Sequence, residues 1–193
     1  MAAAPTQGST YDKITIYSLD GKTDVDLRLG VVGLQYFEDL YSPAISAKMM
    51  VANTETVNGK GVYNGLPIRG GEKVEIEITT PIEEHREEPG EFKITLYVNR
   101  MSDYVQEKQK EVFTLDLISK EGITNLNKRV IKKYKAKKIS DIIKDFLKMV
   151  ECEYEDEDIE KTENAYNFIG NMRKPFTLAP MLASRAIPEG GKS

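Results

Sequence analysis

The sequence predicts an α+β protein: an N-terminal antiparallel β-barrel over residues 1–119, followed by a smaller helix-rich α/β domain over residues 120–193. Apolar residues recur at every second position up to about residue 118, and at helical spacing from about residue 121. Turn residues separate at least six short strand-like runs in the first part. One strongly amphipathic segment, 139–150, dominates the second part.

The first strands are expected to form a hairpin. Residues 11–19 alternate between apolar and polar and end at Asp20-Gly21, a dipeptide that favours a tight turn between strands. Val25 and Leu27 continue the alternation on the other arm.

Further strands follow, separated by segments with turn chemistry. A segment rich in Asn and Gly at 53–71 predicts a long loop, and a charged segment bounded by prolines at 81–90 predicts an exposed one. The other expected strands cover 31–40, 44–52, 74–79, 92–98 and 112–118, with a short helix between the first two as an alternative. Several short strands with turns between them favour a barrel or a sandwich, and closure into a barrel would leave no exposed edge.

The second part begins with a basic segment, for which we expect a helix over 125–138 that ends in a loop. Ser140 is the expected N-cap of the amphipathic helix that follows, with Asp141 placed favourably in its first turn. A short strand at 165–169 and a final helix capped by Thr177 are the last expected elements.

The apolar stripe of the amphipathic helix is large for so small a domain. Because residues 120–193 offer little material to cover it, we expect something outside this chain to complete its burial. The predicted interface with another subunit uses this stripe and the final helix, at Ile139, Ile142, Phe146, Phe176, Leu182 and Arg185.

Composition narrows the class of protein. The formal net charge is −4 with both signs interspersed, which argues against a general polyanion binder. The single cysteine, Cys152, excludes an internal disulfide and a cysteine-based zinc site, and its acidic neighbours raise a thiol pKa. The N-terminus lacks the features of a secretory signal, and no apolar run approaches the length of a membrane span.

The titratable residues form no pattern that predicts catalysis or metal binding. His85 lies in the charged loop without a nucleophile pattern near it. Glu75 and Glu77, the candidate acid pair of a hydrolase such as a peptidoglycan hydrolase, are expected on the solvated face of a strand. The acidic run at 153–158 lacks the glycine and spaced oxygens of a calcium loop, and serves better as a solvated loop or a partner for the basic segment. We therefore expect no enzyme, no metal and no cofactor.

Two further patterns concern anionic ligands. Glycine-rich segments at 58–61 and 69–71 lack the strand-to-helix context of a phosphate cradle. The basic segment 128–138 contains Tyr134 and could follow a phosphate backbone, although an acidic run lies within one helix of it. The alternative function is therefore a barrel-type nucleic-acid-binding module that uses 128–138.

Two segments carry a resemblance to a known family. KKISDIIKDFL at 137–147 and NMRKPFTLAPMLASRA at 171–186 resemble two helices of the baseplate hub proteins of contractile-tailed bacteriophages. Residues 24–53 also resemble the hub barrel of that family, which precedes an α/β insertion. The order and spacing of these segments are more specific than each one alone.

The resemblance implies a structural subunit of a phage tail baseplate. In that family three hub subunits form a torus with tail-tube-like barrels, so that a sixfold tube can sit on a threefold spike. The implied protein is a non-enzymatic virion component, assembled in the host cytoplasm as a homo-oligomer, with the tube and spike proteins as partners. Phage DNA would pass only as cargo through the channel, and no membrane would be involved. Because the family protein continues into a second tube-like domain, this chain is expected to be its N-terminal part.

Overall fold

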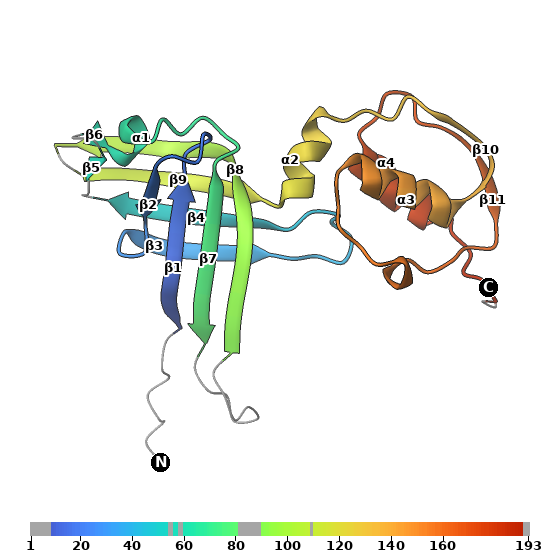
Figure 1. The fold of residues 1–193 in the computed structure, drawn as a ribbon, viewed down its shortest axis with the longest axis horizontal. Coiled ribbons are helices and arrows are strands. Elements are labelled where there is room, and N and C mark those ends of the chain that lie inside the picture. Colours follow the sequence, from blue (N-terminus) through green and yellow to red (C-terminus); the bar gives the residue numbers. More distant parts are fainter. Residues whose placement is uncertain (1–8, 54–55, 58–59, 81–89, 109, 191–193) are drawn as a thin grey trace, which may run out of the picture. The chain divides into compact units, whose positions relative to one another are not determined.

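A computed structural model describes residues 9–53, 56–57, 60–80, 90–108 and 110–190. The chain divides into two compact units (Figure 1). Unit 1 comprises Met1–Phe37 and Ser46–Ser119, and unit 2 comprises Glu38–Ile45 and Lys120–Ser193.

Unit 1 is a seven-stranded antiparallel sheet that curls into a half-barrel, which confirms the predicted α+β class with its barrel-like sheet. The order of the strands is β2-β1-β7-β8-β9-β4-β3. Their bounds are β1 (Thr10–Tyr17), β2 (Asp24–Asp26), β3 (Val31–Phe37), β4 (Ser46–Asn53), β7 (Lys73–Thr80), β8 (Gly90–Glu107) and β9 (Lys110–Ile118). The predicted hairpin is confirmed, because β1 pairs antiparallel with β2.

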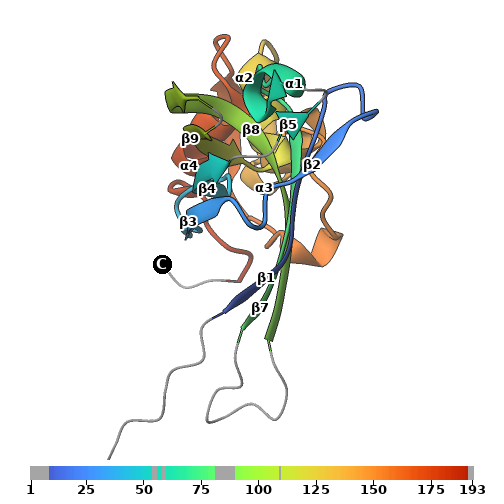
Figure 2. The ribbon, with the colours of Figure 1, turned by 90° about the vertical axis from the view of Figure 1, so that its left-hand side faces the viewer.

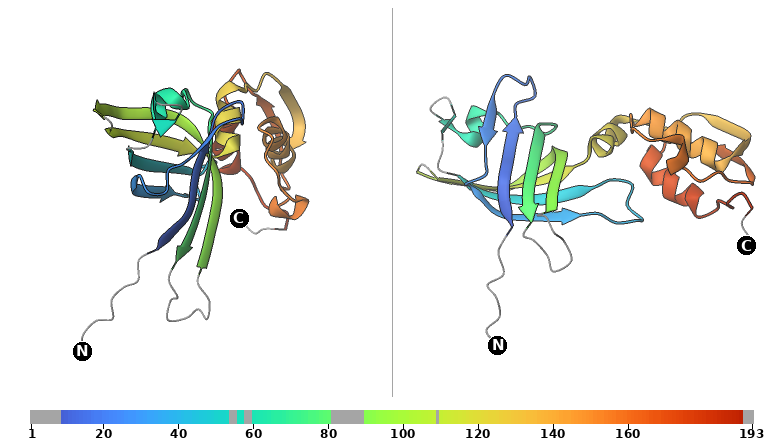
Figure 3. Two further views of the ribbon diagram at one scale, coloured as in Figure 1. Left: turned by 60° about the vertical axis from the view of Figure 1, so that its left-hand side comes forward. Right: turned by 60° about the horizontal axis from the view of Figure 1, so that its bottom comes forward.

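The long strand β8 is what turns the sheet back on itself. Its first half pairs with β7, and its second half pairs with β9. Two register shifts interrupt the second ladder, between Val98 and Arg100 and between Ser102 and Val105, and Asp103 there has φ 54°. Such bulges bend a strand and increase its twist. In Figure 3, β1 and β7 (blue and green) accordingly run across the direction of β3 and β4 (light blue and cyan).

The segment predicted as a long loop contains three short elements. These are β5 (Thr56–Val57), β6 (Lys60–Gly61) and the single-turn helix α1 (Val62–Gly65). The buried Glu111 carboxylate accepts hydrogen bonds from the Tyr63 amide and the Tyr104 hydroxyl, at 3.3 Å and 2.9 Å. This carboxylate therefore ties α1 to the β8–β9 hairpin.

Unit 2 packs two helices against a two-stranded sheet. Its elements are α2 (Lys120–Asn127), β10 (Lys133–Lys138), α3 (Ile139–Met149), the 3-10 turn η1 (Asp156–Asp158), β11 (Ala165–Ile169) and α4 (Pro175–Ala183). The strand predicted at 165–169 is confirmed as β11, and α3 lies against α4 and β10 (Figure 1).

The helix predicted over 125–138 is wrong in most of its length. The helix ends at Asn127, and Lys133–Lys138 is strand β10, which pairs antiparallel with β11. Tyr134 lies opposite Phe168 in this ladder, and both rings are buried while Lys133 is exposed. Burial of Tyr134 against a strand some thirty residues away therefore overrides the local helical preference of the lysines.

Both predicted helix caps also differ from the structure. Helix α3 begins at Ile139, so Ser140 lies inside it; the Ser140 amide donates to Thr162 Oγ1 at 3.0 Å, and the Thr162 amide donates to Ser140 Oγ at 3.3 Å. Helix α4 begins at Pro175, whose fixed φ suits the first helical position, rather than after Thr177. Distant residues therefore satisfy groups that the sequence suggested were capped locally.

Unit 2 has its own aromatic core. The rings of Tyr134, Phe146 and Phe168 lie with centroids 6.1–6.3 Å apart. The buried core residues are Val130, Tyr134, Ile139, Ile142, Phe146, Phe168, Leu178 and Leu182. The prediction that this stripe needs material from outside the chain is wrong, because β10, β11 and α4 cover it.

Candidate functional site

The structure covers five of the six predicted interface residues with their own chain. Ile139, Ile142, Phe146 and Leu182 are at most 1% exposed, and Phe176 is 9% exposed. A partner cannot reach these side chains in this conformation, because the aromatic core of unit 2 encloses them. Arg185 is exposed; its guanidinium donates to the Tyr166 hydroxyl at 2.6 Å and lies over that ring. Arg185 stays a predicted interface residue.

The candidate acid Glu75 is held as a carboxylate. Lys13 Nζ, Lys73 Nζ and the Tyr17 hydroxyl donate to it at 2.6, 2.7 and 2.8 Å. These hydrogen bonds, led by that of Lys13, lower the pKa of Glu75 to about 2. Such a group cannot supply a proton near neutral pH. Within the described part of the chain, no group of three or more potential ligands could hold a metal ion, and His85 lies outside that part.

The glycine turn at 69–71 already holds an anion from its own chain. Glu72 is fully buried, and its two carboxylate oxygens accept hydrogen bonds from the amides of Arg69 and Gly70 at 2.7 and 2.9 Å. Gly70 and Gly71 have φ of 108° and 95°, a conformation that glycine adopts without strain. The amides that would cradle a phosphate are therefore occupied. The other glycine segment, 58–61, lies partly outside the described residues.

Most cations of the basic segment are paired with carboxylates inside unit 2. Lys132 and Lys137 contact Asp145 at 2.9 and 3.1 Å. Burial alone would raise the pKa of Asp145, but these two ammonium groups outweigh it and hold that pKa below its ordinary range. Tyr134 is 3% exposed, and burial, with the nearby Asp145 charge, raises its pKa to about 12. This ring is not available to stack on a nucleotide base.

Cys152 behaves as its acidic neighbours suggest. Burial first, and then the charges of Glu121 and Glu153, raise the pKa of its thiol. A thiol in this state is a poor nucleophile at neutral pH.

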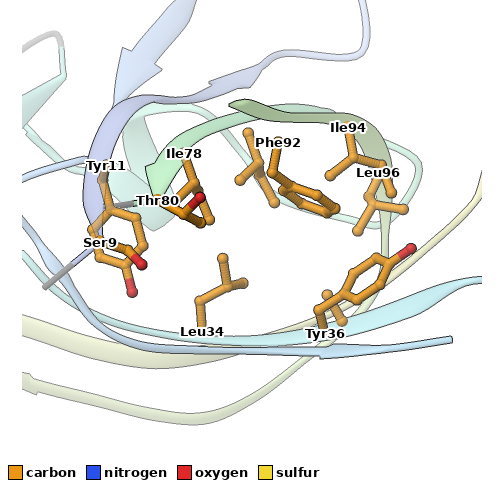
Figure 4. A pocket seen from close by; sticks show the side chains of 11 residues that line it. Ser9, Tyr11, Leu34, Tyr36, Ile78, Thr80, Phe92, Ile94 and Leu96 are labelled. Carbon is orange, nitrogen blue, oxygen red and sulfur yellow. The ribbon is translucent and has the colours of Figure 1, made fainter. Parts of the chain in front are cut away.

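An apolar groove of about 380 Å³ lies on the inner face of the unit 1 half-barrel (Figure 4). Leu34 and Tyr36 of β3 form one wall and face Ile78 of β7 and Phe92 of β8 on the other. The described residues that line it are Ser9, Tyr11, Leu34, Tyr36, Ala47, Ile76, Ile78, Thr80, Phe92, Ile94 and Leu96.

The groove is suited to hold apolar surface. The Tyr36 and Phe92 rings meet edge to face with centroids 5.1 Å apart, and Leu34, Ile78 and Ile94 beside them are only half-buried. Among the residues that the structure describes, the lining contains no Asp, Glu, Lys, Arg, His or Cys. Its polar groups are hydroxyls, which can orient a ligand but supply no acid, base or nucleophile tuned for chemistry at neutral pH.

The wall made by β3 is also an edge of the sheet. Strand β2 at the opposite edge has three residues and exposes Asp24 and Asp26, whereas β3 has seven residues and no charge. Val32 and Phe37 on β3 are 65% and 52% exposed. Short, charged edges resist pairing with another chain, and long uncharged ones invite it. The edge of β3 with the groove beside it is the candidate functional site, named here the β3 face; Figure 2 shows β3 at the border of the sheet.

Reasoning from the sequence alone missed this site. The uncharged run at 31–37 is visible in the sequence, but nothing local shows that it borders the sheet. Among the described residues, no helix is both long and apolar enough to span a membrane.

No family model and no curated protein matches this chain. Two solved structures have a similar arrangement of elements. A tail protein from Neisseria meningitidis is 11% identical with a TM-score of 0.49, and the match covers 92% of this chain and 45% of that one. An E. coli component of the type VI secretion system, described as structurally similar to the T4 bacteriophage tail proteins gp27 and gp5, is 9% identical with a TM-score of 0.42. That match covers 93% of this chain and 41% of the other. The chain spans less than half the length of both proteins, and the likeness is one of fold alone.

Proposed function

We propose that this chain is a non-enzymatic structural subunit of a phage tail baseplate, one copy of a hub ring that joins the tail tube to the central spike and surrounds the DNA channel. The observation that carries the proposal is the β3 face. Its edge strand has seven uncharged residues and borders an apolar groove of about 380 Å³. Natural sheets cover such an edge or pair it with another strand.

The β3 face suits repeated contacts between subunits. An added strand gains main-chain hydrogen bonds from the edge, and its alternate side chains gain burial from the groove. A head-to-tail contact closes into a ring when the rotation between successive copies is a whole fraction of a turn. The sequence segments at 137–147 and 171–186 support the more specific assignment to a hub, with three copies in the ring, the tube and spike proteins as neighbours, and phage DNA as cargo. The expected location is the virion, after assembly in the host cytoplasm.

The described side chains favour assembly over the other two classes of function. An enzyme would need a titratable group poised near neutral pH, whereas Glu75 is held ionised and the described residues of the groove lining include no such group. A nucleic-acid module would need free cations and an exposed aromatic ring, whereas Tyr134 is buried and Asp145 engages two of the lysines.

The test is the state of association of the purified chain, by native mass spectrometry and negative-stain imaging. We expect threefold rings that Val32→Lys disperses, because a lysine on the edge opposes strand pairing. Leu19→Lys is the matched control: Leu19 is 63% exposed against 65% for Val32, and lies in the turn after β1 rather than on the β3 edge. Rings that persist in Val32→Lys, or a monomer that turns over a substrate, would contradict the proposal.

A further inference from the structure

Unit 2 carries an exposed apolar patch at the end of the β10–β11 ladder where β10 begins and β11 ends. Ile131, Ile169 and Met172 are 78%, 58% and 69% exposed. Backbone hydrogen bonds from Gly170 to the Lys132 carbonyl and from Met172 to the Val130 carbonyl hold Ile131 beside the turn that follows β11. Such a group of large apolar side chains adds nothing to the core of unit 2.

The turn that presents Met172 is conformationally costly. Asn171 and Met172 both have positive φ, 48° and 57°, and the Arg173 amide donates to the Gly170 carbonyl at 3.1 Å to close the turn. Glycine and asparagine fit this region, but methionine does not. The chain therefore holds an apolar side chain in an unfavourable backbone conformation and leaves it in solvent.

Two cations beside the apolar residues are not neutralised. Lys133 lies directly opposite Ile169 in the ladder, and Lys133 and Lys135 are both exposed. Neither takes part in an ion pair with any described residue, in contrast to Lys132 and Lys137 of the same segment. We call Ile131, Lys133, Lys135, Ile169 and Met172 the ladder patch. It would suit a partner that has carboxylates with apolar side chains between them.

Unit 2 itself contains a segment with this chemistry on a different part of its surface. Residues 153–160, here the acidic segment, are E-Y-E-D-E-D-I-E, with Tyr154 and Ile159 half-buried among exposed carboxylates. Asp156 contacts Lys144 at 2.6 Å, but Glu153, Glu157 and Glu160 form no ion pair within the described chain. Its free charges are opposite in sign to those of the ladder patch.

We infer that the ladder patch of one copy binds the acidic segment of a second copy, head to tail. The two surfaces are different, so the contact is heterologous and can repeat around a ring. The inference rests on the proposed function, since it supplies a second contact between copies that are already expected to assemble. A second copy fits better than a nucleic acid, because two free cations among three apolar side chains give little phosphate affinity.

The test uses two charge-reversed forms of the full chain. Variant A carries Lys133→Glu and Lys135→Glu, and variant B carries Glu153→Lys, Glu157→Lys and Glu160→Lys. Each variant should self-associate about tenfold more weakly than the wild type, in sedimentation velocity at low salt, because like charges now meet at the contact. Wild-type association through this contact should also weaken as salt rises. All five positions are exposed, so the thermal midpoints of unfolding should match that of the wild type.

Mixing the variants gives the decisive result. Variant A keeps its acidic segment and variant B keeps its ladder patch, so the mixture should form a one-to-one complex that neither forms alone. A chain with all five substitutions should associate like the wild type. Unchanged self-association of A and B, or no complex in the mixture, overturns the inference.

The outcome is separable from that of the proposed function. If Val32→Lys disperses the rings but variants A and B leave them intact, the proposed hub function stands and the inferred contact of the ladder patch is wrong. If variants A and B form a complex but the wild type forms no rings, the inferred contact stands and the proposed hub function is wrong. Binding of a single-stranded oligonucleotide that variant A abolishes, with self-association unchanged, would assign the patch to nucleic acid and overturn the inference.

Discussion

The two units bury apolar surface in opposite ways. Unit 2 is the smaller, yet β10, β11, α3 and α4 enclose its aromatic core, with Phe146 fully buried. Unit 1 has a seven-stranded sheet, but its half-barrel leaves Leu34, Ile78 and Phe92 around an open groove and ends at an uncharged edge. The comparison teaches that the order of strands and the direction of curl, rather than the amount of chain, decide which apolar surface remains for a partner.

The largest expected effect comes from the closed core of unit 2. Phe146→Ala should lower the free energy of unfolding of unit 2 by about 3–5 kcal/mol, because it removes a fully buried ring that contacts Tyr134 and Phe168. Hydrogen exchange should show loss of protection in α3, β10 and β11, with the strands of unit 1 unaffected. Ile131→Ala, at an exposed position of the same unit, is the control. If Phe146→Ala left the free energy of unfolding of the isolated chain unchanged, the core of unit 2 would not be closed.

A smaller loss is expected where a distant residue caps α3. Thr162→Val keeps the shape of the side chain but leaves the buried Ser140 amide without its acceptor, at a cost of about 1–3 kcal/mol. Thr177→Val, at an exposed residue of α4, should change stability little. Urea denaturation followed by far-UV circular dichroism measures both. If Thr162→Val and Thr177→Val lowered stability equally, the hydrogen bond from the Ser140 amide to Thr162 would not be what stabilises the start of α3.

The groove should matter less for stability than for association. Phe92 is half-buried, so Phe92→Ala should cost about 1 kcal/mol, mostly through the lost contact with Tyr36. If the β3 face binds another subunit, the same substitution should weaken ring formation more than it weakens folding. Native mass spectrometry beside thermal unfolding separates the two effects. A large loss of stability without loss of rings would show that the groove is part of the core.

The smallest effect is a dependence of stability on pH from Glu75. Its folded-state pKa of about 2 lies below its ordinary value of 4.5, so the unfolded state binds more protons between these values. Stability from this group is therefore complete above about pH 4.5 and is lost as the pH falls toward 2. Because its side chain is 24% exposed, solvent screening limits the contribution to about 1 kcal/mol or less. Glu75→Gln should flatten the stability profile in this window, as measured by urea denaturation at a series of pH values.

Part of the candidate site could be read from the sequence. Residues 31–37 are mostly apolar and carry no charge, and this pattern correctly predicted a strand. Its place at the border of the sheet depends on the pairing of β4 with β9, a strand that lies far along the chain and leaves β3 with β4 as its neighbour. Five of the six interface residues predicted in unit 2 are buried for the same reason, because the residues that cover Phe146 include Phe168 and Leu182, more than twenty positions away.

The sequence by itself determined where the strands of the unit 1 sheet lie and which helix is amphipathic, because these patterns arise between neighbours two to four positions apart. It also determined the absence of a histidine or cysteine pattern suited to catalysis. Only the tertiary structure decided that Lys133–Lys138 is a strand, that Glu72 fills its own glycine turn and that Thr162 caps α3. Each of these outcomes depends on which side chain meets which backbone after the chain has folded, so no local pattern could determine it.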